Sequence, residues 1–290
     1  MFGESKFEVL EKVPHAYKPK TILIKIPVTA DEVIRRMQEN RLTFPLIFKP
    51  DLGERGWMVR KISNKQDVDN YLRESGIDFL AQELVDLPLE FGVFYIRYPS
   101  ETSGRVTSIV GKEMLNVEGD GKQTLQELIL NKDRAKLQWK FLKEVYKDKV
   151  QVVIPEGEKI ELVSIGNHCL GTRFINENHL ITKKLSDSFD LISKQIDGFY
   201  FGRFDLRVAT LQDLEDGRVL VMELNGCGAE PAHIYQPGFP ISKALVVLFR
   251  HWSDIYRISA ENHQRGIAYI SFKEARSIYK KFKVLTAENA

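Results

Sequence analysis

The first part of the chain alternates short apolar runs with longer amphipathic segments. Four runs of strand length predict β-strands: Thr21–Ile26, Phe44–Lys49, Met58–Ile62 and Phe79–Val85. Two segments open with a capping-box pattern and predict helices: Thr29–Glu39 and Ser63–Glu74. A short helix over Lys6–Val13, stopped by Pro14, precedes them. This order of strands and helices predicts an α+β unit.

The same patterns continue through the rest of the chain. Further strands are predicted at Phe91–Tyr98, Val106–Leu115, Val150–Ile154 and Lys159–Val163. Further helices are predicted at Thr124–Leu130, Arg134–Lys147, Asp187–Asp197, Pro240–Tyr256 and Tyr269–Val284. The helix at Thr124 begins with a third capping box, Thr-Leu-Gln-Glu.

One stretch, Gly202–Glu230, combines strand patterns with charged residues. Arg203, Asp205 and Arg207 alternate with apolar residues, which places them on one side of an extended strand. Asp216-Gly217 is a dipeptide typical of hairpin turns. In the apolar run that follows, Glu223 and Asn225 share a face because they are two residues apart. An antiparallel hairpin would therefore gather these polar side chains at one end of a sheet.

The gathered residue types suit a metal ion. Asp205, Glu223 and Asn225 offer hard oxygen donors, which Mg²⁺ prefers alongside substrate phosphates. The alternative is a salt-bridged hairpin on a sheet surface, and the residue types alone leave both open. A carboxylate in an apolar strand carries a desolvation cost, which favours a functional role.

A glycine-bearing loop follows the strand that ends in Lys49-Pro50. Gly53 and Gly56 would let backbone N–H groups approach phosphate oxygens, and Lys49 would add a positive charge. The sequence contains neither a GxGxxG dinucleotide fingerprint nor a Walker A loop. A plain hairpin loop is the alternative interpretation.

Composition narrows the class of protein. The 290 residues are 43% hydrophobic and 28% charged with a net charge of +2, which is ordinary for a globular protein and favours neither nucleic acid nor an anionic membrane as partner. No apolar run is long enough to span a bilayer, and the N-terminus has no apolar signal core, so we expect a cytoplasmic protein. Cys169 and Cys227 have no metal-ligand spacing, which argues against a zinc site or a disulfide framework.

The order of these motifs resembles the ATP-grasp superfamily. GRFD followed by ELN resembles its Mg²⁺-binding end, specifically in the carboxylate–amine ligase branch that contains D-alanine–D-alanine ligase and cyanophycin synthetase. The lysine-proline strand end, the glycine loop and an acidic hinge strand at residues 81–85 appear upstream in the family's order. The string GDGKQTLQELI resembles a segment of cyanophycin-synthetase-type domains.

The resemblance implies an α+β ATP-grasp fold in which two α+β subdomains clamp ATP between two antiparallel sheets. The nucleotide-clamping subdomain would cover residues 1–88, and the Mg²⁺-binding subdomain residues 89–250. A helical tail would cover residues 251–290. The loop at residues 51–57 would be a lid that excludes water.

The resemblance also implies a set of ATP-binding residues: Lys6, Lys49, Gly53, Arg55, Gly56, Glu83, Leu84, Val85, Glu90 and Lys112. Glu83 and the backbone near Leu84–Asp86 would read the adenine, and Glu90 would accept from the ribose hydroxyls. For Glu90 the alternative is a solvated loop acid. Lys183 is a weaker candidate than Lys112 for the second-sheet phosphate lysine.

At the metal end, the resemblance implies that Asp205, Glu223 and Asn225 bind Mg²⁺, with two ions expected and Mn²⁺ as a possible substitute. Arg203 would be catalytic, stabilising the transferring phosphoryl group and the tetrahedral oxyanion. The alternative for Arg203 is a salt bridge to Asp205, which also places it at the metal.

The loop after the metal ligands would face the substrates. Gly226, Gly228, Glu230, His233 and, by analogy, Arg173 are candidate substrate contacts, and loop capping is the alternative for Glu230 and His233. Cys227 is interpreted as a small packed residue rather than a nucleophile.

The predicted activity is ATP-dependent ligation of a small-molecule carboxylate to an amine through an acylphosphate. Two alternatives stay open at this point: a phosphotransferase that acts on a hydroxyl, and a non-catalytic ATP-binding module. The domain that usually precedes an ATP-grasp ligase has little room in this chain, so we expect a homodimer or a partner protein that supplies it.

Overall fold

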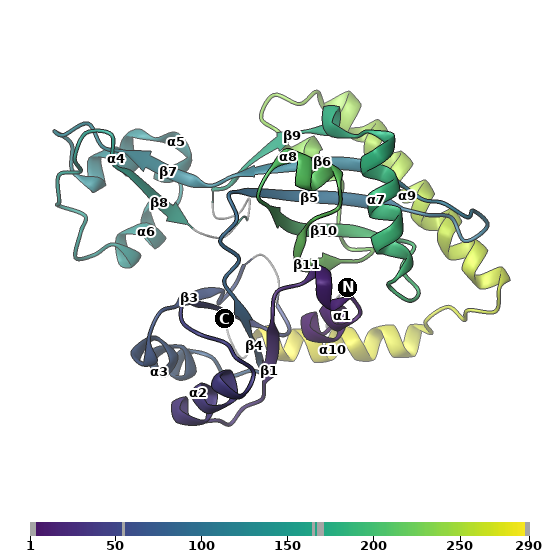
Figure 1. Ribbon diagram of the computed structural model, residues 1–290, viewed down its shortest axis with the longest axis horizontal. Coiled ribbons are helices and arrows are strands. Elements are labelled where there is room, and N and C mark those ends of the chain that lie inside the picture. The colour runs from purple at the N-terminus through teal and green to yellow at the C-terminus, as the bar shows by residue number, and fades with distance from the viewer. Residues whose placement is uncertain (1–3, 54–55, 164–165, 167–170, 288–290) are drawn as a thin grey trace. The chain divides into compact units, whose positions relative to one another are not determined.

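The computed structural model describes residues 4–53, 56–163, 166 and 171–287 (Figure 1). The chain forms two compact units. The first comprises Met1–Gly111 and Asn176–Ala290, and the second comprises Lys112–Ile175. The structure is α+β with antiparallel sheets, as predicted. These units divide the chain at other points than the predicted subdomains, whose boundaries stay a prediction.

A four-stranded antiparallel sheet lies in the N-terminal part of the first unit, in the order β1-β4-β2-β3. Its strands are β1 (Thr21–Ile24), β2 (Leu46–Pro50), β3 (Arg60–Ile62) and β4 (Phe79–Glu83). Helices α2 (Ala30–Glu39) and α3 (Lys65–Glu74) pack on it, because Val33 and Val68 share a buried cluster with Phe48 and Phe79.

Side-chain hydrogen bonds cap the N-termini of α2 and α3. Thr29 caps α2 by accepting from the Glu32 N–H, but the Glu32 carboxylate pairs with arginines instead of closing the predicted box. The box predicted at Ser63 is wrong by one residue. Asn64 caps α3 and accepts from the Asp67 N–H, because its side-chain oxygen reaches the exposed donors of the first turn.

A second sheet has the order β11-β10-β5-β6-β9. Its strands are β5 (Leu89–Ile96), β6 (Arg105–Glu113), β9 (Arg173–Asn176), β10 (Phe201–Val208) and β11 (Leu220–Asn225). β6 and β9 cross the boundary between the two units. α7 (Lys183–Lys194) covers one face, where Phe189 meets Phe204 and the other apolar residues of β10 (Figure 1). The polar residues of β10 therefore belong to the opposite face.

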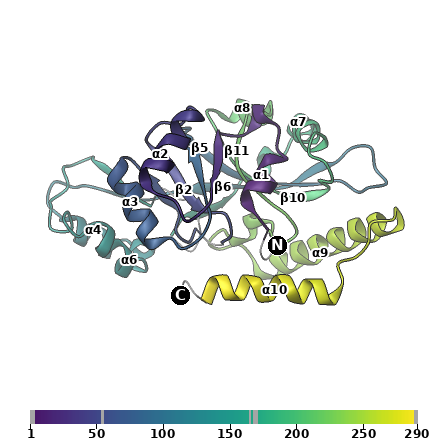
Figure 2. The same cartoon turned by 90° about the horizontal axis from the view of Figure 1, so that it is seen from below.

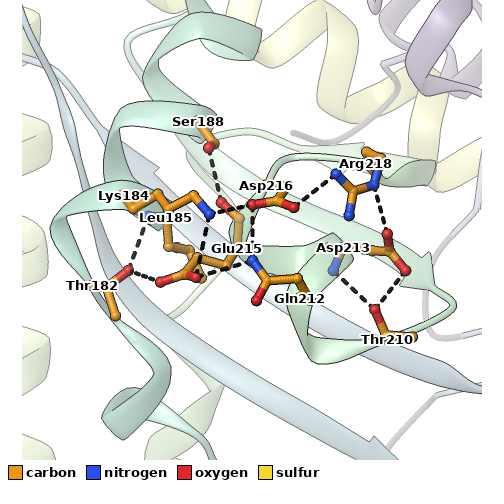
Figure 3. Close-up of polar contacts among 10 residues, drawn as sticks. All are labelled: Thr182, Lys184, Leu185, Ser188, Thr210, Gln212, Asp213, Glu215, Asp216 and Arg218. Atoms are coloured by element: carbon orange, nitrogen blue, oxygen red, sulfur yellow. Dashed lines mark hydrogen bonds and ion pairs between the residues drawn. The ribbon is translucent and has the colours of Figure 1, made fainter.

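The connection from β10 to β11 contains a helix, α8 (Leu211–Glu215), where the sequence predicted a hairpin turn. Asp216-Gly217 ends this helix, and Gly217 has a φ of 72°. The same dipeptide suits both structures because a left-handed glycine follows a helix as readily as it forms a tight turn. Figure 3 shows how polar contacts join α8 to α7: Lys184 pairs with Asp216, and Thr182 donates to Glu215.

Helix boundaries elsewhere also differ from the prediction. α1 (Lys6–Glu11) is short, α7 begins earlier than Asp187, and α9 (Ile241–Gln264) extends past Tyr256. α10 (Phe272–Ala287) follows an exposed segment (Figure 2). None of the helices in the described ranges is both long and apolar enough to cross a membrane.

The second unit has its own core. Strands β7 (Leu115–Glu118) and β8 (Lys159–Val163) pair antiparallel, and α4 (Leu125–Asn131) starts with the predicted capping box. The sequence predicts a single helix at Arg134–Lys147, but the structure has two, α5 (Asp133–Lys136) and α6 (Trp139–Val145). Both contribute to one buried cluster, α5 through Ala135 and α6 through Leu142. The strand predicted at Val150–Ile154 is reduced to a bridge between Thr124 and Val153.

Candidate functional site

The pairing of β10 with β11 brings the predicted metal-binding residues together. Arg203 lies opposite Asn225, and Asp205 lies opposite Glu223. Directly opposed residues of an antiparallel pair have neighbouring side chains, so the four polar groups form one cluster. The predicted antiparallel arrangement is therefore present, although α8 rather than a tight turn makes the connection.

Arg203 and Asp205 form a bidentate ion pair. Arg203 Nε and one terminal nitrogen donate to the two Asp205 carboxylate oxygens, each at 3.0 Å. Asn225 Nδ2 donates to Asp205 Oδ2 at 2.9 Å. Burial lowers the pKa of Arg203, but the adjacent Asp205 carboxylate outweighs it and leaves this pKa above its ordinary value. The guanidinium therefore stays charged in a partly buried position.

Two lysines reach Glu223 and its strand from other parts of the first unit. Lys6 of α1 forms an ion pair with Glu223 Oε1. Lys49 of β2 donates to the Met222 carbonyl at 2.9 Å and to Gln82 Oε1 at 3.0 Å. Burial raises the pKa of Glu223, but Lys6 and Lys49 together bring it below the ordinary value. Burial also lowers the pKa of Lys49, to about 8.

Asp51 fixes the position of Lys6 relative to β2. Its Oδ1 accepts from the Ser5 hydroxyl and from the Phe7 N–H, each at 2.9 Å. Its carbonyl accepts from the Lys6 N–H at 3.1 Å. Since Asp51 directly follows β2, the start of α1 is tied to the strand that carries Lys49.

The charges of this cluster suit a polyphosphate anion accompanied by a cation. Lys6, Lys49 and Arg203 outnumber the carboxylates of Asp205 and Glu223 by one charge. Across the described residues, no three His, Cys, Asp or Glu side chains are grouped to hold a metal ion. Two carboxylates and an amide oxygen nevertheless match the sparse protein ligation that Mg²⁺ shows beside phosphates. The donor set fits Mg²⁺ together with a nucleotide better than Mg²⁺ alone.

The predicted adenosine-binding residues lie at the ends of β4 and β5. Glu90 is buried in β5 and pairs with Arg207 at 2.9 Å, so the alternative of a solvated loop acid is wrong. Arg207 also donates to the Val85 carbonyl at 3.0 Å. Glu83 ends β4 and accepts from the Lys20 N–H at 3.2 Å, and Leu84 follows it. Their contacts with a nucleotide stay a prediction.

The glycine loop is described only in part. Arg55 lies outside the described residues, and Gly56 has a φ of 73°, which favours glycine. A side chain at Gly53 would meet Trp57 and Pro50 at ordinary distances. The lid function of residues 51–57 stays a prediction.

The predicted substrate residues divide between the two units. In the first, Glu230 bonds to the Tyr235 hydroxyl, and burial with this carboxylate raises the pKa of Tyr235 to about 12. Gly226 and Gly228 border open space, since an added Cβ would meet nothing within 4 Å. The substrate candidate Arg173 belongs to the second unit, where it pairs with Glu113 at 3.5 Å. Lys112, the candidate phosphate lysine, belongs to the same unit.

Sequence reasoning missed two residues that support the cluster. Gln82 is 3% exposed in β4 and links Lys49 to Thr21. Gly92 lies opposite Asp205 in β5. A glutamine in an apolar strand and a glycine in the middle of one were the available signals, because each is unfavourable there without a compensating contact.

Gly92→Ala is expected to destabilise the protein by about 1–3 kcal/mol, as overpacking does. The new Cβ would lie 2.8 Å from Val110 Cγ1 and 3.2 Å from both Arg203 Cδ and Asp205 Oδ1. Urea unfolding measures the loss. Gly228→Ala is the control, because its Cβ meets nothing. Equal stability of the two variants would contradict this account of Gly92.

His233 predicts a pH dependence. Its Nδ1 lies 2.7 Å from Ser108 Oγ, and burial lowers its pKa. The unfolded chain binds a proton at this residue near pH 6.5, whereas the folded protein resists it, so stability should fall as pH drops below about 6.5. Urea midpoints at several pH values should fall less steeply in His233→Asn. The same replacement at exposed His179 should leave the slope unchanged, and an unchanged slope for His233→Asn would contradict the prediction.

Comparison with known proteins gives structural similarity only. No protein-family profile matches the chain, and no curated protein sequence is significantly similar to it. Among solved structures, the chain is similar to the VanG D-Ala:D-Ser ligase from Enterococcus faecalis, with 15% identity, a TM-score of 0.48, and coverage of 87% of this chain and 62% of that one.

Two further ligases show the same level of likeness. For the D-alanine–D-alanine ligase from Bacillus anthracis, identity is 12%, the TM-score is 0.48, and coverage is 91% of this chain and 69% of that one. For the ATP-grasp ligase PsnB, solved with a minimal precursor, identity is 16%, the TM-score is 0.43, and coverage is 87% of this chain and 60% of that one. The chain thus spans about two thirds of the length of these proteins.

Proposed function

We propose that this protein is an ATP-dependent carboxylate–amine ligase of the ATP-grasp superfamily. The observation that carries the proposal is the cluster on β10 and β11, in which Arg203, Asp205, Glu223 and Asn225 face one another. Lys6 and Lys49 join it from distant parts of the chain. An excess of cations around two carboxylates is the electrostatic arrangement that a nucleotide polyphosphate with Mg²⁺ requires.

In this proposal the residues divide the work of binding ATP. Lys6 and Lys49 contact the phosphates, and the N–H groups near Gly53 and Gly56 cover them. Glu83 and the backbone of Leu84 and Val85 bind the adenine. The ribose hydroxyls donate to Glu90, whose carboxylate is already oriented by Arg207.

Asp205, Glu223 and the Asn225 amide oxygen would hold Mg²⁺. When bound, the ion neutralises phosphate charge and orients the polyphosphate. Arg203 is preorganised by its two bonds to Asp205, so it presents a fixed positive charge without reorganisation during the reaction.

The proposed reaction has two steps. A substrate carboxylate attacks the γ-phosphorus, the bond to the β-phosphate oxygen breaks, and ADP leaves an acylphosphate behind. An amine then adds to the acyl carbon and loses a proton, and phosphate departs as the amide forms. Arg203 and Lys49 offset the negative charge that accumulates in both steps.

ADP release from Mg·ATP tests the proposal, measured against a panel of amino acids and small peptides with Glu223→Ala as the blank. ADP that appears only with one carboxylate and amine pair, together with a new amide, is the expected result. A phosphorylated hydroxyl product would instead identify the protein as a phosphotransferase. A Mg·ATP-dependent rise in melting temperature, with no ADP released from any mixture, would identify a non-catalytic nucleotide-binding module.

A further inference from the structure

The outward side of α9 carries a row of apolar side chains. Five residues form this row, which we call the α9 stripe: Ile241, Leu245, Phe249, Trp252 and Tyr256. Their exposed fractions are 79%, 51%, 74%, 55% and 76% in that order. More than half of the exposed large apolar side chains in the described part of the chain lie beyond residue 240. The apolar surface is therefore concentrated on one region rather than scattered.

The opposite side of α9 is held firmly by the rest of the first unit. His251 is buried and packs edge-on against Phe94, and Ile258 is buried beside it along the helix. The Arg257 guanidinium lies 3.7 Å above the Tyr98 ring. The Ser100 N–H donates to Glu261 at 2.9 Å. These contacts fix the orientation of α9 about its own axis. The α9 stripe therefore faces outward in the folded protein.

The spacing of the stripe is that of a helix–helix seam. Leu245, Phe249, Trp252 and Tyr256 follow one another at intervals of four, three and four, which is the a/d pattern of a heptad repeat. In a coiled coil, a row with this spacing packs against a second helix.

The positions that flank this seam carry no charge. They are Val246, Leu248, Ser253 and Ile255. Lys243, Arg250 and Arg257 occupy the b positions, one step farther from the seam. Two copies of α9 can therefore meet without like charges opposite each other. A helix that lies on an anionic lipid surface would instead carry basic residues beside its apolar row.

The area also fits a second copy. With 150–250 Å² for a whole aromatic side chain, the exposed parts of the stripe sum to roughly 600 Å². That is at the upper limit for the largest apolar patch of a monomer, and close to the roughly 800 Å² that each partner contributes to a stable interface. We propose that the α9 stripe is the interface through which two copies of this chain form a homodimer. This inference is independent of the proposed ligase activity.

Light scattering and sedimentation velocity of the full chain test it, at concentrations from about 1 to about 50 µM. The wild-type chain should be a dimer. Phe249→Asp/Trp252→Asp should weaken association at least about 100-fold and leave a monomer, because buried aromatic residues dominate such interfaces. Leu191→Asp is the matched control, since Leu191 is 66% exposed on α7, and it should stay dimeric. Circular dichroism spectra should be the same in all three, which shows that α9 still folds.

Each other outcome overturns the proposal. A monomeric wild-type chain across the range would do so, as would a dimer that persists in the double variant. Phe272→Asp/Tyr279→Asp in α10 is the second discriminating variant, because these exposed residues belong to the neighbouring helix. If this variant alone became monomeric, the interface would belong to α10 and the α9 stripe would not be the seam.

Discussion

Glu223→Ala should lower turnover by at least about a hundredfold, the effect expected for removing a preorganised charge-stabilising group. Glu223 lies next to the other charged side chains of the cluster. It pairs with Lys6, it lies opposite Asp205, and Lys49 bonds to the residue beside it. Without this carboxylate the lysines lose their counter-charge and the proposed metal site loses a ligand. The measurement is ADP release with the substrate pair found in the panel.

Two variants sharpen this test. Glu223→Gln keeps the shape and removes the charge, so it should lose nearly as much turnover as the alanine variant. Glu39→Ala removes a carboxylate that pairs with Arg35 on an exposed helix face, and it should stay close to wild type. Near-normal turnover of purified, folded Glu223→Ala would end the metal-ligand hypothesis.

Arg203→Met should reduce the free energy of unfolding by about 3–5 kcal/mol, the cost of breaking a buried ion pair by removing one partner. Asp205 is 5% exposed, and Arg203 supplies two of its hydrogen bonds. After the substitution, this buried carboxylate would lose its counter-charge and both of the hydrogen bonds that Arg203 donates. Urea unfolding followed by circular dichroism measures the change.

The double variant Arg203→Met/Asp205→Asn separates charge from packing. If the single variant is destabilised because the buried Asp205 carboxylate has lost its counter-charge, neutralising Asp205 should recover at least half of the loss. Arg35→Met, at an exposed ion pair, should change stability by less than about 0.5 kcal/mol. A loss below about 1 kcal/mol for Arg203→Met would mean that the pair is open to water.

The sequence predicted the β10–β11 cluster because a strand has a fixed period of two. Once Asp205 and Glu223 are placed on adjacent antiparallel strands, their shared face follows from backbone geometry. The α+β class and the capping box at Thr124 were equally local. The ion pair between Lys6 and Glu223 was not foreseeable from spacing, since 217 positions separate the two residues. Tertiary contacts of α1 bring them together: the hydrogen bonds to Asp51 and the packing of Leu10 in the core that contains β11.

Other misses came from signals that serve two structures. Asp216-Gly217 can close a hairpin or end a helix, and the choice depended on α8 packing toward α7. Gly92 is visible as a glycine within a strand, but the sequence does not show that its lack of a side chain makes room for Arg203 and Asp205. The outward position of the α9 stripe was not predicted, because the sequence does not show which side of a helix meets the rest of the fold.

The route of the chain through β6 and β9 makes the second unit an insertion. The Glu177 N–H donates to the Ile109 carbonyl at 3.0 Å, so the chain leaves the first unit and returns to it at neighbouring points. A short loop from Gly111 to Asn176 could therefore replace residues 112–175 at a small cost in closure entropy. We therefore expect that this segment can be exchanged or deleted while the strands that carry the charged cluster keep their connections.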